Sequence, residues 1–279
     1  MNDVTPQRLF EMAWGFAPAL TIKTATEVAV FDALAAGPRT ADDIAESTNC
    51  SSRGMRIMLD ALGGFGLLAK VDGAYRLTPE SEAFLVSSQP GYLGPIFQHF
   101  GATMLPDFLS LTECVRRGEP VLAVNDQRSG APFFEKFVEA LFPVNAPSAG
   151  VLARHLALAN DASVLDVAAG SGVWGITLAK SAQGVRVTAV DWPNVLEITR
   201  RVAASYGVAD RFTFAPGDLL EADFGDGHQV ATLGQILHTE GEERSRALLR
   251  RVQAALSSVD WVPQQMTTAA VPRKPTISA

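Results

Sequence analysis

The sequence predicts an α/β fold in two parts: a mostly helical N-terminal domain of the winged-helix type, and a C-terminal domain with a doubly wound parallel sheet. The N-terminal half has apolar residues at helical spacing and one compact hairpin signal. After about residue 160, short β-branched runs alternate with helical patterns, which is typical of a parallel sheet. With 279 residues, 47% of them hydrophobic, the chain can bury two cores.

Helical patterns and a hairpin make up the expected winged helix. Asp72-Gly73 is a strong turn signal between two short runs of strand-forming residues. Serine and threonine residues that can cap helices precede the neighbouring helical patterns. The expected elements are two helices within 6–35, a helix capped by Thr40, a helix capped by Ser51 or Ser52 that ends near Leu62, and strands over 67–70 and 74–77.

A winged helix raises the alternative of DNA binding. Arg53 and Arg56 lie on the helix that would be the recognition helix. The formal net charge of −7 argues against a polyanionic partner. We therefore expect no nucleic-acid partner.

Cysteine content and hydropathy limit the class of protein further. Cys50 and Cys114 lack the spacing of a disulfide framework or a zinc site, so we expect reduced thiols and no metal. The N-terminus lacks an export pattern, and no apolar run is long enough to span a membrane. A cytoplasmic protein without a membrane partner is the expectation.

Large apolar side chains recur on the helical patterns between Pro90 and Pro147. Such a stripe is typical of plain packing or of a subunit interface. Some of its members can instead line a cleft for an apolar substrate, because ligand pockets are largely apolar and favour domain junctions. The sequence leaves both interpretations open. The residues are Phe97, Phe100, Met104, Phe108, Phe133, Phe134, Phe137 and Phe142.

The C-terminal domain is expected to alternate strands with helices. The strand signals are short and contain β-branched residues, and the helical patterns lie between them. The predicted strands cover 164–167, 185–190, 212–215 and 230–233, and the predicted helices cover 174–181, 195–205 and 242–256.

The strongest candidate site follows the first of these strands, where residues 166–172 read Asp-Val-Ala-Ala-Gly-Ser-Gly. Small residues such as Gly170 and Gly172 let a ligand lie against the backbone. The N-terminus of the next helix offers free N–H groups and a positive dipole end to an anion such as an amino-acid carboxylate. The carboxylate of Asp166 suits a cationic amino group.

Two further strand ends extend this site. Asp191 ends the second strand about 20 residues after Gly170, where a carboxylate can accept hydrogen bonds from both ribose hydroxyls. Gly217-Asp218 follows the third strand and is placed to hold an adenine amino group. Together these positions predict a nucleotide-like cofactor.

A dinucleotide cofactor is the main alternative, because residues 170–175, Gly-Ser-Gly-Val-Trp-Gly, also match the pattern G-x-G-x-x-G. An NAD-dependent oxidoreductase is therefore a rival. Against it, Asp166 suits a cationic amino group better than a pyrophosphate, and Gly217-Asp218 has no role in the dinucleotide fingerprint. A purely structural glycine turn is the remaining alternative.

A histidine follows the fourth strand, where residues 234–238 read Gly-Gln-Ile-Leu-His. This is the carboxyl edge of the sheet, at which open α/β folds bind ligands. Imidazole gains and loses its proton near neutral pH, so His238 can remove the proton of a phenol or alcohol as a general base. A surface or capping role is the alternative. The other histidines, His99, His155 and His228, have no comparable position.

This order of parts resembles the small-molecule O-methyltransferases of the plant type and their bacterial relatives in natural-product tailoring, over residues 10–256. In that family a winged-helix domain serves dimerisation, a helical layer shapes the acceptor pocket, and a Rossmann-like methyltransferase domain binds S-adenosylmethionine. The resemblance implies a dimerisation domain over 1–89, a helical layer over 90–145, a Rossmann-like domain over 146–256, and an irregular tail over 257–279.

Site roles follow from the same resemblance, which implies methyl transfer to a hydroxyl oxygen of a small aromatic or polyketide-like acceptor by a homodimer. No metal is needed. Three alternatives remain: an S-adenosylmethionine-binding hydroxylase or decarboxylase, a non-catalytic dimerising protein, and the oxidoreductase. The implied contacts are Gly170 and Gly172 for the methionine part, Asp191 for the ribose, Gly217 and Asp218 for the adenine region, Asp166 and Gln235 as further cofactor contacts, and His238 as the base.

The chain departs from the family pattern at two places. Ala168 stands where the family commonly has glycine. After Leu256 the expected Pro-Gly-Gly turn and fifth strand are replaced by an aperiodic tail. One hypothesis is that a frameshift produced this tail, which would leave a truncated domain with an incomplete parallel sheet and an exposed fourth strand.

Overall fold

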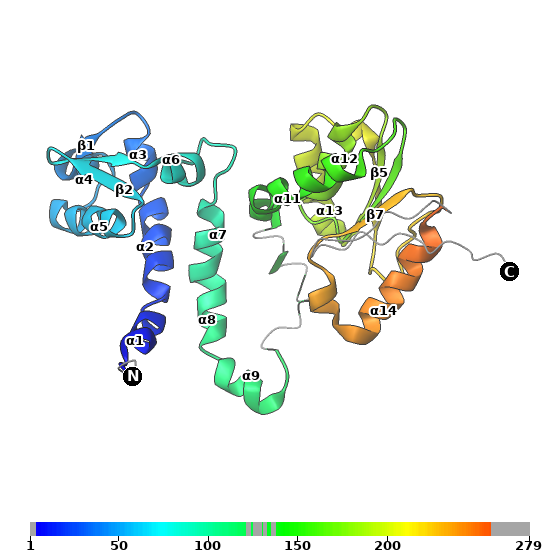
Figure 1. Cartoon of the computed structure of the whole chain (residues 1–279), viewed down its shortest axis with the longest axis horizontal. Coiled ribbons are helices and arrows are strands. Elements are labelled where there is room, and N and C mark those ends of the chain that lie inside the picture. Colours follow the sequence, from blue (N-terminus) through cyan, green and yellow to red (C-terminus); the bar gives the residue numbers. More distant parts are fainter. Residues whose placement is uncertain (1–3, 121–123, 125–129, 131–132, 135–137, 258–279) are drawn as a thin grey trace. The chain divides into compact units, whose positions relative to one another are not determined.

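A computed structural model describes residues 4–120, 124, 130, 133–134 and 138–257. The chain divides into two compact units, Met1–Val121 and Leu122–Ala279 (Figure 1). None of the helices in the described ranges is long and apolar enough to cross a membrane.

The first unit contains the predicted winged helix, and capping residues begin two of its helices. Helix α4 (Ala41–Ser47) starts after Thr40, whose hydroxyl accepts the Asp43 N–H while the Asp43 carboxylate accepts the Thr40 N–H. Helix α5 (Ser52–Gly64) starts after Ser51, whose hydroxyl accepts a backbone N–H of the first turn. These bonds satisfy N–H groups that have no partner within the helix.

The hairpin follows these helices. Strands β2 (Leu68–Val71) and β3 (Ala74–Leu77) pair antiparallel, and the turn residues Asp72 and Gly73 both have positive φ, as a tight hairpin turn requires. A short strand β1 (Arg39–Thr40), which the sequence did not predict, pairs with β3. The buried ring of Tyr75 joins the hairpin to the core of this unit.

Three helices, rather than the predicted two, lie within residues 6–35. The helical conformation is interrupted at Ala29, just before the third helix begins. The φ of Ala29 is 56°, which belongs to the left-handed region. The remaining helices follow the hairpin and include one π-helical turn. The helices are α1 (Gln7–Ala13), α2 (Phe16–Glu27), α3 (Val30–Leu34), α6 (Pro79–Leu85), α7 (Gly94–His99), the π-turn η1 (Phe100–Met104), α8 (Leu105–Phe108) and α9 (Leu111–Arg117).

The second unit is built on a parallel sheet, which confirms the predicted α/β fold. In the part of the chain that the structure describes, the strand order is β6-β5-β4-β7. Every neighbouring pair is parallel, so the carboxyl ends of the strands meet at one edge. The strands are β4 (Ser163–Val167), β5 (Arg186–Asp191), β6 (Phe212–Pro216) and β7 (Val230–Leu233).

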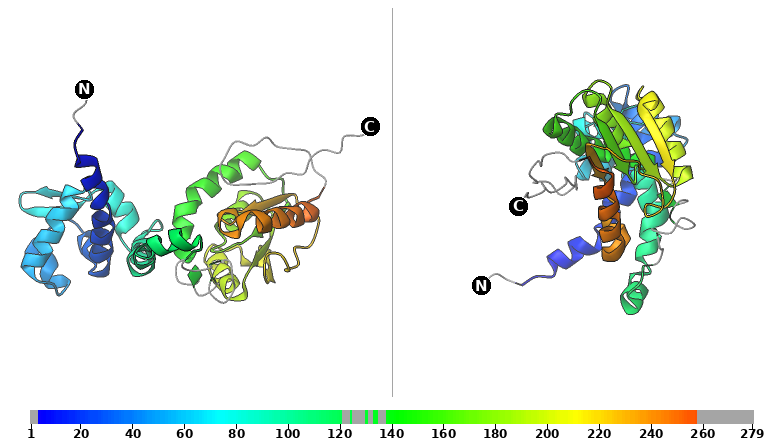
Figure 2. Two further views of the ribbon diagram at one scale, coloured as in Figure 1. Left: turned by 90° about the horizontal axis from the view of Figure 1, so that it is seen from below. Right: turned by 90° about the vertical axis from the view of Figure 1, so that its right-hand side faces the viewer.

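Helices cover both faces of this sheet. Helices α12 (Val173–Ser181) and α13 (Pro193–Ser205) bury one face, and α14 (Leu237–Ala255) buries the other, as the end-on view in Figure 2 shows. Helix α11 (Leu141–Leu156) and the 3-10 turns η2 (Val138–Ala140) and η3 (Ala209–Arg211) complete the unit. The predicted irregular tail, from residue 258 onward, lies outside the described residues.

Candidate functional site

A cavity of about 540 Å³ opens in the second unit at the carboxyl ends of β4, β5 and β7, and all of its lining residues belong to that unit. This volume is typical of a small-molecule site. The wall is mostly apolar and aromatic, with a few polar side chains at separate places. The polar or charged residues on it are Asn145, Ser171, Asp191, Gln235, His238, Thr239 and Glu240.

The glycine loop after β4 forms one side of the cavity. Gly170 lies on the wall with a φ of 56°, and a Cβ there would come within 2.9 Å of Val138. Its N–H donates to Asp191 and its carbonyl accepts the Thr199 hydroxyl. Gly172 caps α12 behind the wall, against Thr199. The loop therefore offers backbone, rather than side chains, to a ligand at the start of α12.

Asp191, at the end of β5, is the half-buried carboxylate of the cavity. Its Oδ2 accepts the Gly170 N–H at 2.9 Å and its Oδ1 accepts the Trp192 N–H at 2.8 Å. Burial raises the pKa of Asp191 to about 6, although both hydrogen bonds act to lower it. Each carboxylate oxygen keeps a further lone pair, so the group can also accept two ligand hydroxyls.

Asp166 lies beneath the loop rather than on the cavity wall. Its side chain is fully buried, with Oδ2 accepting the Gly175 N–H at 2.9 Å and Oδ1 accepting the Thr232 hydroxyl at 2.7 Å. Burial, with a smaller contribution from Asp191, raises the pKa of Asp166 to about 7. The expected contact with a cationic amino group is not available in this arrangement. Instead, Asp166 joins β4 to β7 and to α12.

The variant Asp166→Asn is expected to flatten the pH dependence of folding stability. The pKa of Asp166 rises from 3.8 to about 7 on folding. The folded state therefore binds more protons within that window, and the free energy of unfolding falls as pH rises through it. Asparagine can keep both hydrogen bonds and stays neutral. At about 1.4 kcal/mol per pKa unit, a gain of a few kcal/mol is expected at about pH 8.

Urea unfolding of both proteins at about pH 5 and about pH 8 measures this effect. The stability difference between the two proteins should be larger at the higher pH than at the lower pH by about 2 to 3 kcal/mol. An Asp166→Asn protein that loses stability between these pH values as steeply as the parent would contradict the assignment.

His238 lies on the wall in a short turn between β7 and the long part of α14. Two left-handed residues bracket that turn: Gln235, with a φ of 61°, and Gly241, with a φ of 70°. At Gly234, a Cβ would come within 2.0 Å of the Trp174 indole nitrogen, so only glycine lets the turn approach that ring. The His238 side chain is exposed, and among the described residues it accepts or donates no hydrogen bond. A ligand in the cavity can reach it.

The predicted pair Gly217-Asp218 lies beside the cavity, not on its wall. The Gly217 N–H donates to the Asp191 carbonyl. The Asp218 carboxylate accepts hydrogen bonds from Arg244 and from the Leu220 N–H. Of the eight predicted site residues, the structure therefore brings four to the cavity: Gly170, Asp191, Gln235 and His238.

The members of the predicted apolar stripe lie in different places, some on the cavity wall and others in packing contacts. Phe133 and Phe134 line the cavity and contact each other edge to face. Phe97 packs against the core of the first unit, and Phe142 stacks on Tyr206. The predicted member at position 137 lies outside the described residues.

Trp174, Trp192 and Glu240 are wall residues that the sequence analysis did not assign to the site. Trp174 stands inside the glycine pattern and Trp192 directly follows Asp191, so both were adjacent to signals already identified. Glu240 stands two residues after His238, and the two side chains form no hydrogen bond in the described structure. The sequence does contain one signal for Glu240: it stands four residues before Arg244, which is the spacing of an ion pair on a helix.

The residues present are suited to a nucleoside with an amino-acid tail. Backbone at Gly170 and the start of α12 accommodates a compact anionic end, and the Asp191 carboxylate can accept from sugar hydroxyls. Across the described ranges, no group of three or more histidine, cysteine, aspartate or glutamate side chains is arranged to hold a metal ion.

Two family profiles match the chain. The O-methyltransferase dimerisation domain matches residues 10–87, and the methyltransferase domain matches residues 164–258. Among solved structures, the assigned O-methyltransferase of Nostoc punctiforme is 28% identical with a TM-score of 0.82, over 92% of this chain and 78% of that one. CalO1, a methyltransferase of calicheamicin biosynthesis with S-adenosylhomocysteine bound, is 25% identical with a TM-score of 0.74, over 92% and 79%.

Curated relatives agree with these matches. The 3-hydroxy-5-methyl-1-naphthoate 3-O-methyltransferase of Streptomyces sahachiroi is 31% identical over 91% of this chain and 74% of that protein. The tetracenomycin polyketide synthesis 8-O-methyltransferase TcmO of Streptomyces glaucescens is 27% identical over 90% and 76%. The chain belongs to the S-adenosylmethionine-dependent O-methyltransferases.

Proposed function

We propose that the cavity of the second unit binds S-adenosylmethionine beside an aromatic acceptor, and that His238 is the general base for methylation of the acceptor's hydroxyl oxygen. The observation that carries this proposal is the meeting of Gly170, Asp191 and His238 on the wall of one cavity. These residues follow three different strands, so the shared strand edge is what brings them together.

Each of these residues has a distinct task. Backbone at Gly170 holds the methionine part, and Asp191 accepts from the ribose hydroxyls. When bound, S-adenosylmethionine supplies an electrophilic methyl group on a sulfonium. His238 removes the acceptor's hydroxyl proton as the oxygen becomes nucleophilic, and its exposure lets that proton pass on to water. Placement of the two reactants supplies much of the remaining acceleration.

Aromatic side chains on the wall favour a flat acceptor. Phe133, Phe134 and Trp192 all line the cavity, and Phe134 lies 6.3 Å from Trp192 between ring centroids. Such rings hold a planar ligand by stacking and edge contacts. Because the named relatives act on a naphthoate and in polyketide synthesis, we take hydroxylated polycyclic aromatic compounds as the acceptor class.

We also propose that the protein forms a homodimer through its first unit. Helix α1 has no buried residue, and its neighbourhood exposes Leu9, Phe10, Met12 and Trp14 by 60% or more. An exposed apolar cluster of this kind is typical of a protein interface. The match to a dimerisation domain over residues 10–87 supports the same partner, a second copy of this chain.

Transfer of an isotope-labelled methyl group tests the proposed reaction. The protein is incubated with labelled S-adenosylmethionine and a set of hydroxynaphthoates, together with their methyl ethers and amino analogues as matched controls. Label is expected on oxygen of the hydroxyl compounds and not on their methyl ethers. Label found only on the amino analogues, or on no hydroxyl compound although S-adenosylhomocysteine binds, would contradict the proposal.

A further inference from the structure

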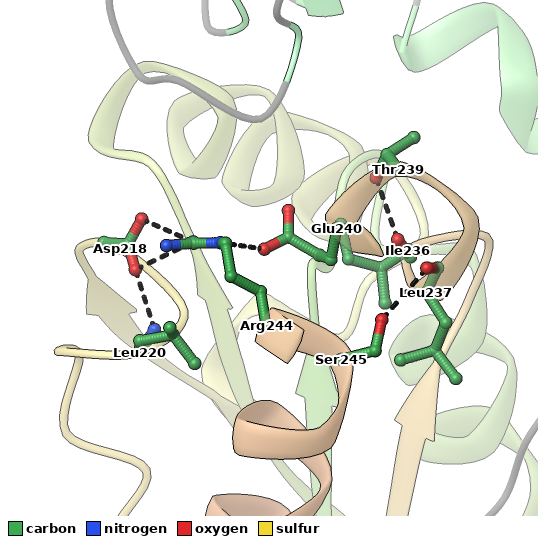
Figure 3. A network of polar contacts seen from close by, with 8 residues as sticks. All are labelled: Asp218, Leu220, Ile236, Leu237, Thr239, Glu240, Arg244 and Ser245. Atoms are coloured by element: carbon green, nitrogen blue, oxygen red, sulfur yellow. Dashed lines mark hydrogen bonds and ion pairs between the residues drawn. The ribbon is translucent and has the colours of Figure 1, made fainter. Parts of the chain in front are cut away.

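Two charged side chains that the sequence did not assign, Glu240 and Arg244, form an ion-pair network with Asp218 beside the cavity (Figure 3). The Arg244 Nη2 lies 3.0 Å from Asp218 Oδ2 and 3.2 Å from Asp218 Oδ1. The Nε of the same guanidinium lies 2.6 Å from Glu240 Oε2. One planar group therefore ties the turn after β6 to the first turn of α14.

Within this network only Glu240 reaches the cavity wall. Its side chain is 4% exposed, which is rare for a glutamate unless the charge is paired. Arg244 binds Oε2, and Figure 3 shows the other carboxylate oxygen pointing away from Arg244. In the described ranges, that Oε1 accepts no hydrogen bond. The buried, charged Glu240 carboxylate therefore has an oxygen at the cavity that can still accept a hydrogen bond from a ligand.

Asp218 does not lie on the cavity wall. Both of its oxygens contact Arg244, and Oδ1 also accepts the Leu220 N–H at 2.8 Å. The side chain that this turn contributes to the wall is the apolar Leu219. The subsite expected after β6 thus consists of an apolar surface from Leu219 and a carboxylate from Glu240.

We propose that Glu240 binds the exocyclic amino group of the adenine ring through Oε1, with Arg244 as its positioning residue. This inference rests on the proposed function, because it assumes that the adenosyl group occupies the cavity. The adenine edge offers an N–H donor beside an apolar ring, which matches a carboxylate and the apolar Leu219 on the wall of the same cavity. Hypoxanthine carries a carbonyl oxygen in place of that amino group, and two acceptors would then face each other.

Calorimetry with S-adenosylhomocysteine and S-inosylhomocysteine tests the assignment without any methyl transfer. The parent protein is expected to bind the adenosine compound about 10- to 100-fold more tightly, since a charged hydrogen bond is lost and an acceptor is left facing an acceptor. Glu240→Gln can turn an amide N–H toward the carbonyl, so its preference is expected to fall below about 5-fold. Glu242→Gln, at an exposed glutamate that pairs with Arg246 and lies outside the cavity, is the matched control and should keep the parent preference.

Arg244 is tested by the same ratio, which a merely structural role would not move. Arg244→Lys keeps a positive charge and is expected to retain part of the preference, whereas Arg244→Met should lose it. Thermal unfolding identifies any variant that fails to fold, and the conservative Glu240→Gln then decides the question.

Two results would overturn the inference. One is Glu240→Gln with the full parent preference. The other is Arg244→Met with the full parent preference, which would remove Arg244 as the positioning residue. Failure of the parent protein to bind S-adenosylhomocysteine at all is a different result, because it would contradict the proposed function itself.

Discussion

Replacing His238 by glutamine is expected to lower kcat for methyl transfer by about 10²- to 10⁴-fold while leaving the affinity for S-adenosylhomocysteine within about 2-fold. Glutamine is similar in size and can still donate a hydrogen bond, but it cannot take the acceptor's proton. The side chain lies on the cavity wall without a hydrogen-bond partner among the described residues, so its replacement disturbs no internal network.

The acidity of the acceptor gives this prediction a second readout. An acceptor that is already ionised at the assay pH needs no base, so the deficit of His238→Gln should shrink for the more acidic phenols. His155→Gln is the matched control, because His155 is exposed on α11 away from the cavity. Parental kcat in His238→Gln with weakly acidic acceptors would remove the assignment of the base.

Replacing Asp191 by asparagine is expected to weaken S-adenosylhomocysteine binding by about 10- to 100-fold, the scale of lost hydrogen bonds to a charged group. The carboxylate accepts one N–H with each oxygen, from Gly170 and from Trp192. An amide has only one oxygen, so its NH₂ group must face an N–H donor. Both the ribose contact and the glycine loop then lose support. Calorimetry with S-adenosylhomocysteine measures this loss of affinity. The control variant is Asp210→Asn, because Asp210 is exposed and lies outside the cavity.

Binding to the parent protein should also depend on pH through this group. Burial raises the pKa of Asp191 to about 6, so the carboxylate is protonated as the pH falls below that value. The protonated form has lost an acceptor, and affinity is expected to fall with it. The Asp191→Asn variant lacks this titration and should show a flatter profile than the parent protein. A parent profile that stays flat between about pH 5 and about pH 7 would contradict this role.

Local signals explain how much of the fold could be predicted. The caps at Thr40 and Ser51 and the turn at Asp72-Gly73 act within a few residues, and the structure confirms them. Each strand of the parallel sheet is a short run that contains β-branched residues, and its predicted limits lie within two residues of the observed ones. The left-handed break at Ala29 has no comparable signal, because an alanine is not expected to adopt a positive φ.

The candidate site was predictable by position but not by side-chain direction. Strand ends gather at one edge, which is why Gly170, Asp191 and His238 meet. Asp166 is still inside its strand, where side chains alternate between faces, and it points toward α12 instead of the cavity. Asp218 was placed at the correct turn, but its contact with Arg244 depends on tertiary packing between β6 and α14.

The structure of the protein with S-adenosylhomocysteine bound tests the central claim most directly. We expect the ribose hydroxyls within hydrogen-bond distance of the Asp191 carboxylate, the amino-acid tail against Gly170 at the start of α12, and the sulfur facing the side of the cavity that carries His238. An adenosyl group bound outside this cavity, or a sulfur turned away from His238 with Asp191 unoccupied by ribose, would contradict it.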